Sequence, residues 1–452
     1  TIFIENDAAL TGGGTFNALA SQRDLFAATT VQSVGDAPFS LIPLHIDDNN
    51  SLDLAVANHR TNKITLLASD GSGGYSMATE ISGGNSLWGM ASIDYDHDGD
   101  DDLAVTNNLH GTVTLIRNDG QNTWTRGQVL NVGVGPLGII ATDLDADGYE
   151  DLAIAISGGT GLLSVFWGAE NGTFPTAGQQ IITGAGTFNL VAGDLDKDGD
   201  LDLAAVNFFA ATISLIRNDG NRSLISNGSL PVADGPISLV AEDLNGDGNR
   251  DIAAVHAVTD TVSILLNQGD WSFGVPIEYA AAREPWTISA ADFDDDGDID
   301  LATPSFHTDS VSLLLNDGVA GFHDANMIPV GDGPLATLKM DVDGDNLPDL
   351  VTADRDSDSV TVLRNISNQI MPLQTGILNV LASTFQGNTA EDGAGLASSG
   401  ELGITESEFS GNVASRDGGG ILSLGESSSS VSRSLIVENT AGGDGGGIRV
   451  LG

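Results

Sequence analysis

The chain has no cysteine and few positive charges, and both absences narrow its chemistry. Without cysteine there is neither a disulfide framework nor a thiolate metal site. There are 16 Lys and Arg against 63 Asp and Glu, a formal net charge of −47. Such an excess repels nucleic acid and anionic membranes and attracts cations, so we expect no nucleic-acid partner.

The sequence also lacks a long apolar run and a signal segment. No stretch of eighteen apolar residues occurs, which predicts no membrane insertion, and Thr1 has no basic region behind it. We therefore expect a chain that was processed or cut from a longer one. Apolar residues still make up 40% and recur in regular strand-like runs, which indicates a folded chain.

Catalytic motifs are missing as well. The seven His residues are scattered, and no G-x-S-x-G nucleophile motif occurs. The paired carboxylates of the acidic loops described next are already accounted for by a metal role. The sequence therefore predicts that the chain is not an enzyme.

An acidic nonapeptide returns seven times. One copy runs from Asp94 to Asp102, and the copies start at 45, 94, 143, 194, 243, 292 and 341. Each unit of about fifty residues holds four short apolar runs bounded by Gly, Asn and Asp, as residues 136–142, 151–156, 162–167 and about 179–183 illustrate. A single four-stranded blade cannot bury both faces, so neighbouring blades must cover them. The pattern predicts an all-β, seven-bladed β-propeller over residues 26–366.

The closure of the ring can be predicted from a second match. Phe322 and residues 330–334 precede the last unit, and Phe26 and residues 34–38 repeat that spacing at the start. The last unit ends after its third strand, residues 360–364. We expect the strand at about 26–34 to complete the seventh blade and remove an open sheet edge.

In the pattern D-x-D-x-D-G-x-x-D, alternate carboxylates can converge on one hard cation, which favours calcium over zinc. Positions one, three, five and nine are predicted side-chain ligands and position seven a carbonyl ligand. In six loops these residues are Asp94, Asp96, Asp98, Asp100 and Asp102; Asp143, Asp145, Asp147, Tyr149 and Asp151; Asp194, Asp196, Asp198, Asp200 and Asp202; Asp243, Asn245, Asp247, Asn249 and Asp251; Asp292, Asp294, Asp296, Asp298 and Asp300; and Asp341, Asp343, Asp345, Leu347 and Asp349.

The seventh loop departs from the pattern. It has His45, Asp47, Asn49, Asn50 and Asp53, too few carboxylates to assign a metal. An acidic turn can also be a solvated loop without an ion. Six copies in register argue against that alternative, because four unpaired carboxylates in one short loop repel each other. We expect about six structural calcium ions.

These repeats resemble the FG-GAP or VCBS-type repeats of integrin α-subunit propellers and of many secreted bacterial proteins. The resemblance covers residues 26 to about 366, and the acidic loops match the family's calcium loops position by position. It implies calcium at the turn between the first and second strands, on one face of the disc. It does not imply a ligand, since the family serves adhesion, lectin and lyase scaffolds alike.

A second repeat occupies the two ends of the chain. Asn388, Asn412 and Asn439 are each followed by a Gly-rich step, at spacings of 24 and 27 that suit a coil of a right-handed parallel β-helix. This motif resembles repeats of polymorphic outer-membrane proteins; a flexible Gly/Ser linker is the alternative. Residues 1–16 carry the same signature. We predict β-helix rungs at 1–16 and 377–452, linkers at 17–25 and 367–376, and a propeller inserted in or attached to the β-helix.

The function indicated by these features is a calcium-stabilised extracellular structural or adhesive protein, with the propeller displayed on a β-helical stalk. Trp88, Phe188, Trp286 and Arg283 are expected on the face opposite the acidic loops, which keeps a carbohydrate-binding, lectin-like module as the alternative. A polysaccharide lyase or hydrolase ranks below both. Expected partners are other copies of the chain, joined end to end in a filament, or a longer β-helical chain, with a glycan or surface protein as ligand.

Overall fold

The computed structural model describes residues 16–18, 25–47, 49, 51–120 and 123–367. In the C-terminal part it describes residues 377–381, 384–386, 389–390, 396–398, 401–405, 408–410, 413–414, 421–423, 430–432, 434–441 and 448–450. The chain divides into two compact units, Leu25–Ser367 and the combined segments Thr1–Asp24 and Asn368–Gly452.

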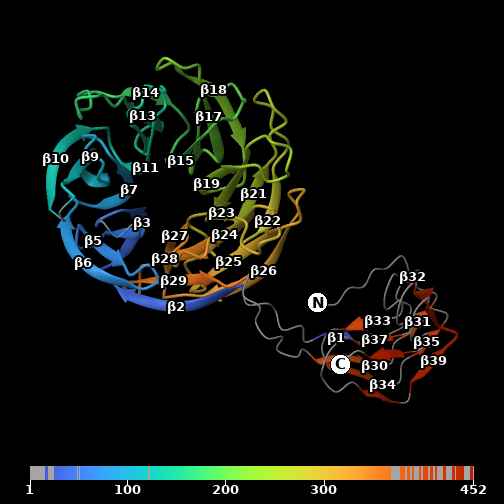
Figure 1. Ribbon diagram of the computed structural model, residues 1–452. Coiled ribbons are helices and arrows are strands. Elements are labelled where there is room, and N and C mark those ends of the chain that lie inside the picture. The colour runs from blue at the N-terminus through green and yellow to red at the C-terminus, as the bar shows by residue number, and fades with distance from the viewer. Residues whose placement is uncertain are drawn as a thin grey trace. The chain divides into compact units, whose positions relative to one another are not determined.

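The larger unit is a ring of seven four-stranded antiparallel sheets (Figure 1). The first three blades are β3 (Pro38–Leu44), β4 (Asp53–Asn58), β5 (Lys63–Ser69) and β6 (Tyr75–Ser82); β7 (Leu87–Ile93), β8 (Asp102–Asn107), β9 (Thr112–Asn118) and β10 (Trp124–Asn131); and β11 (Pro136–Thr142), β12 (Asp151–Ile156), β13 (Leu162–Phe166) and β14 (Gln179–Ile182). The next three are β15 (Thr187–Gly193), β16 (Asp202–Asn207), β17 (Thr212–Asn218) and β18 (Leu224–Pro231); β19 (Pro236–Glu242), β20 (Asp251–His256), β21 (Thr261–Leu265) and β22 (Ile277–Ala280); and β23 (Ser289–Ala291), β24 (Asp300–Ser305), β25 (Ser310–Asn316) and β26 (Phe322–Pro329). The seventh is β2 (Phe26–Ser33), β29 (Ser359–Asn365), β28 (Asp349–Asp354) and β27 (Pro334–Met340). Among the described residues, the one helical element is a 3₁₀ turn at Asn108–His110.

Apolar side chains hold the blades together. Successive side chains of a strand point to opposite faces of its sheet, so they pack against the blade before and the blade after it in turn. Seven clusters of buried residues occur, and each joins the facing sheets of two neighbouring blades around the ring. The second strand of every blade is buried along its whole length, as at Asp102–Asn107, because both of its faces are covered. The all-β, seven-bladed propeller predicted from the repeat is confirmed.

The seventh blade is closed by the N-terminal strand. β2 pairs antiparallel with β29, from Phe26 opposite Asn365 to Ser33 opposite Ser359, and Figure 1 shows the two lying side by side. Phe26 is buried and packs edge-on against Phe293, with ring centroids 5.8 Å apart. The predicted ring closure is therefore confirmed.

In most blades the second strand ends in a polar residue. The side chain of this residue forms a hydrogen bond with a hydroxyl group of the third strand. Asn58 donates to the Thr65 hydroxyl at 2.8 Å, and Asn107 donates to Thr114 at 2.9 Å. In the seventh blade the corresponding residue is Asp354, a fully buried carboxylate that accepts a 2.6 Å hydrogen bond from Thr361. Burial raises the pKa of Asp354 above its ordinary value of 3.8.

Asp354→Asn is expected to stabilise the protein at neutral pH by roughly 1–2 kcal/mol, because an amide at this position carries no buried charge. The folded-state pKa is raised, so the carboxyl stabilises the fold only while protonated, and that contribution is lost as pH rises through the folded pKa. The advantage of the variant should appear on going from pH 3 to pH 7 in denaturant titrations. Asp356→Asn, an exposed neighbour, is the control, and an advantage that does not grow with pH would contradict this account.

The smaller unit contains parallel ladders. β30 (Ile377–Leu381), β34 (Glu401–Thr405) and β38 (Ser430–Ser432) form one, and β31 (Thr384–Gln386), β35 (Glu408–Ser410) and β39 (Leu435–Val437) form another. The other two are β32 (Thr389–Ala390), β36 (Val413–Ala414) and β40 (Thr440–Ala441), and β33 (Leu396–Ser398), β37 (Ile421–Ser423) and β41 (Ile448–Val450). Paired residues such as Phe385 and Phe409, then Phe409 and Ile436, keep the predicted spacings of 24 and 27.

The predicted rung over residues 1–16 lies almost entirely outside the described residues. Its last residue begins β1 (Phe16–Ala18), which pairs with β30 in the antiparallel sense, unlike the parallel ladders. The β-helix and its connection to the propeller remain predictions.

Candidate metal centres

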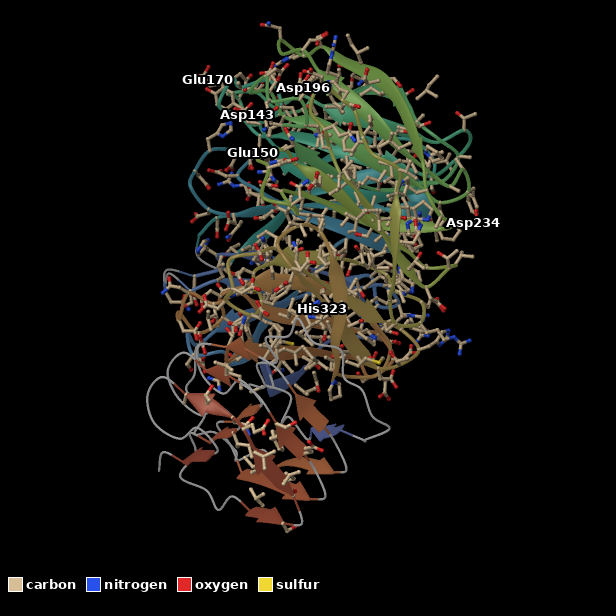
Figure 2. The ribbon with its side chains drawn as sticks, turned by 90° about the vertical axis from the view of Figure 1, so that its right-hand side faces the viewer. Asp143, Glu150, Glu170, Asp196, Asp234 and His323 are labelled. Atoms are coloured by element: carbon tan, nitrogen blue, oxygen red, sulfur yellow. The ribbon has the colours of Figure 1, made fainter. Side chains whose placement is uncertain are left out.

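The acidic loops join the first and second strands of each blade, so they open on one face of the disc. In the side view of Figure 2, Asp143 and Glu150 lie toward one edge of the disc and Asp234 lies at the opposite edge.

Five loops bring three carboxylates together, with oxygen atoms within 4.8 Å of one another. The triads are Asp94, Asp96 and Asp102; Asp143, Asp145 and Asp151; Asp194, Asp196 and Asp202; Asp292, Asp294 and Asp296; and Asp341, Asp343 and Asp349. Four of them use positions one, three and nine, and the triad of the sixth blade uses positions one, three and five. This spacing can hold one cation in each loop.

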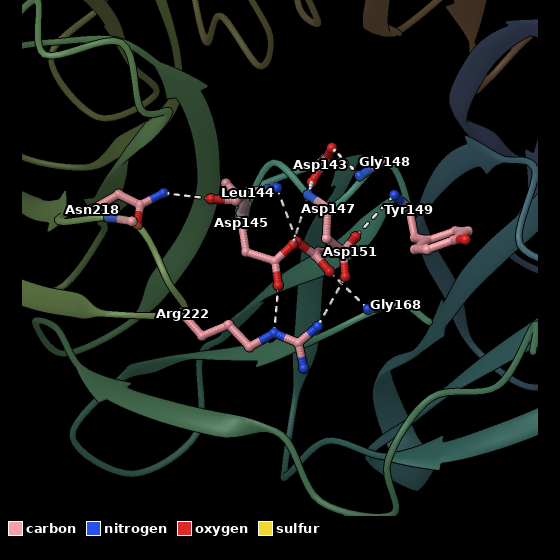
Figure 3. Close-up of polar contacts among 11 residues, drawn as sticks. Asp143, Leu144, Asp145, Asp147, Gly148, Tyr149, Asp151, Gly168, Asn218 and Arg222 are labelled. Atoms are coloured by element: carbon pink, nitrogen blue, oxygen red, sulfur yellow. Dashed lines mark hydrogen bonds and ion pairs between the residues drawn. The ribbon is translucent and has the colours of Figure 1, made fainter. Parts of the chain in front are cut away.

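The loop at 143 shows how the backbone prepares this arrangement (Figure 3). Asp143 accepts hydrogen bonds from the backbone N–H of Asp147 at 3.2 Å and of Gly148 at 2.8 Å. Asp147 in turn accepts the N–H of Tyr149 at 3.0 Å. These bonds leave further lone pairs of the carboxylates available for a cation.

The turn requires left-handed backbone at the fourth loop position. His97, Ala146, Lys197 and Asp295 have φ between 56° and 64° there. Such a conformation costs a non-glycine residue of order 1–3 kcal/mol and is concentrated at functional sites. The sequence pattern drew attention only to the Gly at position six.

Several carboxylate oxygens have no partner. Oδ1 of Asp94, Asp96, Asp194, Asp294 and Asp343 is buried without a hydrogen bond. Burial and a neighbouring carboxylate raise the pKa of Asp96 and of Asp294. Nearly all buried polar atoms in proteins have a hydrogen-bond partner. Oxygens without one are therefore suited to direct contact with a hard cation.

Position nine has a second role that the sequence analysis missed. Asp151 accepts the N–H of Leu144 at 2.9 Å through one oxygen and the N–H of Gly168 at 2.7 Å through the other. Asp53 makes the same pair of bonds, to Ile46 and Ser69, in the loop that lacks the other carboxylates. Position nine therefore holds the loop on the blade whether or not a metal is bound.

Burial of these position-nine carboxyls raises their pKa. The pKa rises to about 7 for Asp102, Asp151, Asp202 and Asp300, and to about 6 for Asp251 and Asp349. A cation at the triad would favour the ionised form by direct attraction.

Arginine side chains reach three of the loops from outside. Arg117 binds Oδ2 of Asp96 at 2.8 Å, Arg364 approaches Oδ2 of Asp343 at 3.4 Å, and Arg222 from the neighbouring blade binds Asp145 (Figure 3). In Asp96 and Asp343 the arginine takes the outer oxygen, and the buried Oδ1 has no partner. The arginines thus offset part of the charge and leave the inner oxygens to a cation.

The remaining predicted ligands are not brought together in this way. Among the described residues, no carboxylate triad forms in the loops at 45 and 243. In the loop at 243, Asn245 replaces a carboxylate and donates to Asp247 at 3.2 Å. The carbonyl role of Asp100, Tyr149, Asp200, Asn249, Asp298 and Leu347 remains a prediction; their N–H groups donate to position five.

A recurring Asn connects each loop to the next blade. The side-chain amides of Asn218, Asn267, Asn316 and Asn365 donate to the carbonyl of loop position two in the preceding blade, at 2.6–2.9 Å. The sequence analysis placed these Asn residues only in turns. Their fixed offset of 24 residues from the loop was the available signal.

Comparison with known families agrees with this geometry. The FG-GAP-like repeat family matches residues 45–105, 94–154, 143–205 and 243–303. The chain carries FG-GAP-like repeats. The Chlamydia polymorphic membrane protein repeat matches residues 406–424 alone, which leaves the β-helix unconfirmed.

Solved propellers are similar in fold to these repeats. BBS1N in complex with ARL6DN is 12% identical with a TM-score of 0.56, over 76% of this chain and 98% of that one. Virginiamycin B lyase from Staphylococcus aureus is 13% identical with a TM-score of 0.53, over 75% and 99%. The periplasmic gluconolactonase PpgL of Pseudomonas aeruginosa is 14% identical with a TM-score of 0.54, over 74% and 92%. No curated protein sequence matches the chain.

These neighbours correct one prediction. We expected a protein that is not an enzyme, but propellers similar to this one include a lyase and a lactonase. The exclusion of catalysis was therefore wrong. At this identity the likeness shows the fold alone, and it assigns no reaction.

No described helix has the length and hydrophobicity needed to span a bilayer.

Proposed function

We propose that the propeller is a calcium-stabilised extracellular scaffold for structural or adhesive contacts. The observation that carries this proposal is the set of five carboxylate triads, four of which contain a buried oxygen without a hydrogen-bond partner. All candidate ligand atoms are oxygens, which matches the preference of calcium for hard ligands. The millimolar calcium outside cells suits sites of ordinary strength, so we assign the protein to the extracellular space.

We further propose that the parallel ladders of the smaller unit form a β-helical stalk. The predicted spacings of 24 and 27 residues support this proposal, as does the match of residues 406–424 to a repeat of polymorphic membrane proteins. Other copies of the chain, or a longer β-helical chain, are the proposed partners.

Calcium titration of chelator-treated protein by isothermal calorimetry tests the scaffold. Asp194→Asn keeps the shape of the side chain but removes one charge from a triad, so the number of bound calcium ions should fall by one. Asp234→Asn, which lies at the opposite edge of the disc, should bind as many ions as the parent. Equal stoichiometry in the Asp194 variant and the parent would refute the assigned site.

Carbohydrate binding is the second candidate function. It is favoured by a group of aromatic rings at one end of the central channel, the space lined by the first-strand segments of the seven blades, opposite the acidic loops.

A further inference from the structure

One register position gives every blade a large apolar side chain at the same place. Six residues before the first loop position stand Phe39, Trp88, Leu137, Phe188, Ile237, Trp286 and Leu335. In six blades this residue falls within a shift of register between the first and second strands. Such bulges re-aim side chains at the rims of barrels and next to active sites.

The aromatic members of this set form a closed circuit. Ring centroids are 4.3 Å apart for Phe39 and Trp88, 5.8 Å for Trp88 and Phe188, 6.3 Å for Phe188 and Trp286, and 5.7 Å for Trp286 and Phe39. These four rings are half-buried.

The aliphatic members, Leu137, Ile237 and Leu335, are buried. The end of the channel is therefore surfaced by aromatic rings. From this point on we call the four rings the aromatic mouth.

The aromatic mouth continues outward along one line. Phe208 lies 6.2 Å from Phe188, and Phe209 lies 5.2 Å from Phe208 with 76% of its surface exposed. The whole chain has 15 Phe, 5 Trp and 4 Tyr, so six of its aromatic residues gather at this one place. A partly exposed cluster of aromatic side chains of this kind is typical of a binding site in soluble proteins.

The aromatic mouth opens on a small cavity of about 200 Å³. Ser40, Asn189, Thr287 and Thr337 line it beside the rings, and none of its lining residues is charged. Sites for drug-sized ligands occupy about 300–1,000 Å³, so this cavity suits a single ring.

The indole of Trp286 points to a hydrogen-bonding ligand. Its Nε1 is buried and has no acceptor. An indole N–H can only donate, and leaving it unpaired is unfavourable. A ligand oxygen would supply the missing acceptor.

We propose that the aromatic mouth binds the terminal pyranose of an uncharged glycan. This inference deepens the carbohydrate-binding candidate and does not depend on the calcium sites. The rings offer flat faces for the sugar, and the hydroxyl and amide groups of the lining offer hydrogen bonds. The uncharged lining and the net charge of −47 both disfavour an acidic sugar.

Two other occupants are less well matched. A quaternary ammonium ion suits an aromatic cage but cannot accept the Trp286 N–H. A protein partner needs an interface of about 1,000 Å² or more, whereas this cavity admits one ring.

The test titrates the calcium-loaded full chain and follows tryptophan fluorescence and heat. The probes are methyl glycosides of glucose, galactose, mannose and N-acetylglucosamine, with methyl glucuronide and choline as competitors. At least one neutral glycoside should bind, with a dissociation constant on the order of 1 mM, as expected for a ligand this small. Methyl glucuronide and choline should bind at least tenfold more weakly.

Variants locate the binding. Trp88→Ala should weaken it at least tenfold, and Trp286→Phe, which keeps a ring but loses the N–H, should weaken it severalfold. Trp124→Phe on the outer strand β10 should leave it unchanged.

The inference is overturned if no neutral glycoside binds. It is also overturned if choline or methyl glucuronide binds as tightly as the neutral glycosides, or if Trp88→Ala and Trp286→Phe both bind like the parent. A melting scan of the same samples with and without calcium separates the two proposals. Protein that calcium stabilises but that binds no glycoside refutes the sugar site and leaves the scaffold standing.

Discussion

Removal of calcium is expected to lower the melting temperature by about 10–20 °C. An ion that binds only the folded state contributes about 2.7 kcal/mol at a concentration one hundred times its dissociation constant. The structure has five carboxylate triads, so the combined effect is on the order of ten kcal/mol. A domain of this size shifts by roughly 1–2 °C for each kcal/mol. Scanning calorimetry with EDTA and with excess calcium measures the difference.

The physical reason is the charge buried in the loops. Asp96 and Asp294 sit beside other carboxylates and have raised pKa values even before a cation is considered. Without a cation these groups must repel each other or take up protons. Magnesium is the control, because its octahedral geometry fits such loops less well than calcium does. Identical melting curves with EDTA and with calcium would contradict this expectation.

Deletion of residues 1–34 is expected to destabilise the propeller by several kcal/mol and to cause aggregation. It removes β2, leaves β29 as an open edge, and strips Leu25 and Phe26 from the cluster around Phe293. Burial of an apolar side chain of this size contributes about 1.5–3 kcal/mol. Thermal melting and light scattering measure the two effects.

Two further variants make this test specific. Deletion of residues 1–14 leaves β2 in place and should melt like the parent. Phe26→Ala keeps the strand but opens a cavity, and should cost about 3–5 kcal/mol. If the 1–34 deletion melts like the parent, the closure by β2 does not stabilise the ring.

The propeller was predictable because its signals repeat. The position of a single strand in one blade is ambiguous, but seven copies in register fixed the strands of the third blade to within one residue of β11 to β14. Ring closure followed from the match between the segments around Phe26 and Phe322, since a three-stranded last blade requires a fourth strand from elsewhere.

The detailed geometry of the candidate metal centres was harder to predict from the sequence. The D-x-D-x-D-G-x-x-D pattern shows which carboxylates are near in sequence, but it does not show which oxygens face inward. Arg222 reaches Asp145 from the next blade, and Asn218 bonds to the carbonyl of Leu144 across a junction. Both contacts join residues more than seventy positions apart. Such contacts depend on how neighbouring blades pack, and a local sequence pattern does not predict that packing.

The aromatic mouth shows the same limit in another form. The sequence analysis placed Trp88, Phe188 and Trp286 on the face opposite the acidic loops but did not recognise that they share one register position with Phe39. Counting back from each loop would have shown the shared offset. The bulges that direct these side chains arise from the register between paired strands, and the sequence of one strand alone does not predict that register.

The calcium content of the purified protein tests the central claim most directly. Protein dialysed to equilibrium against chelator-free buffer of known millimolar calcium is analysed by inductively coupled plasma mass spectrometry, and the calcium of the outer buffer is subtracted. Five triads predict at least five calcium ions per chain, and Asp194→Asn should lose one of them. A protein that keeps its fold and holds no calcium would contradict the account.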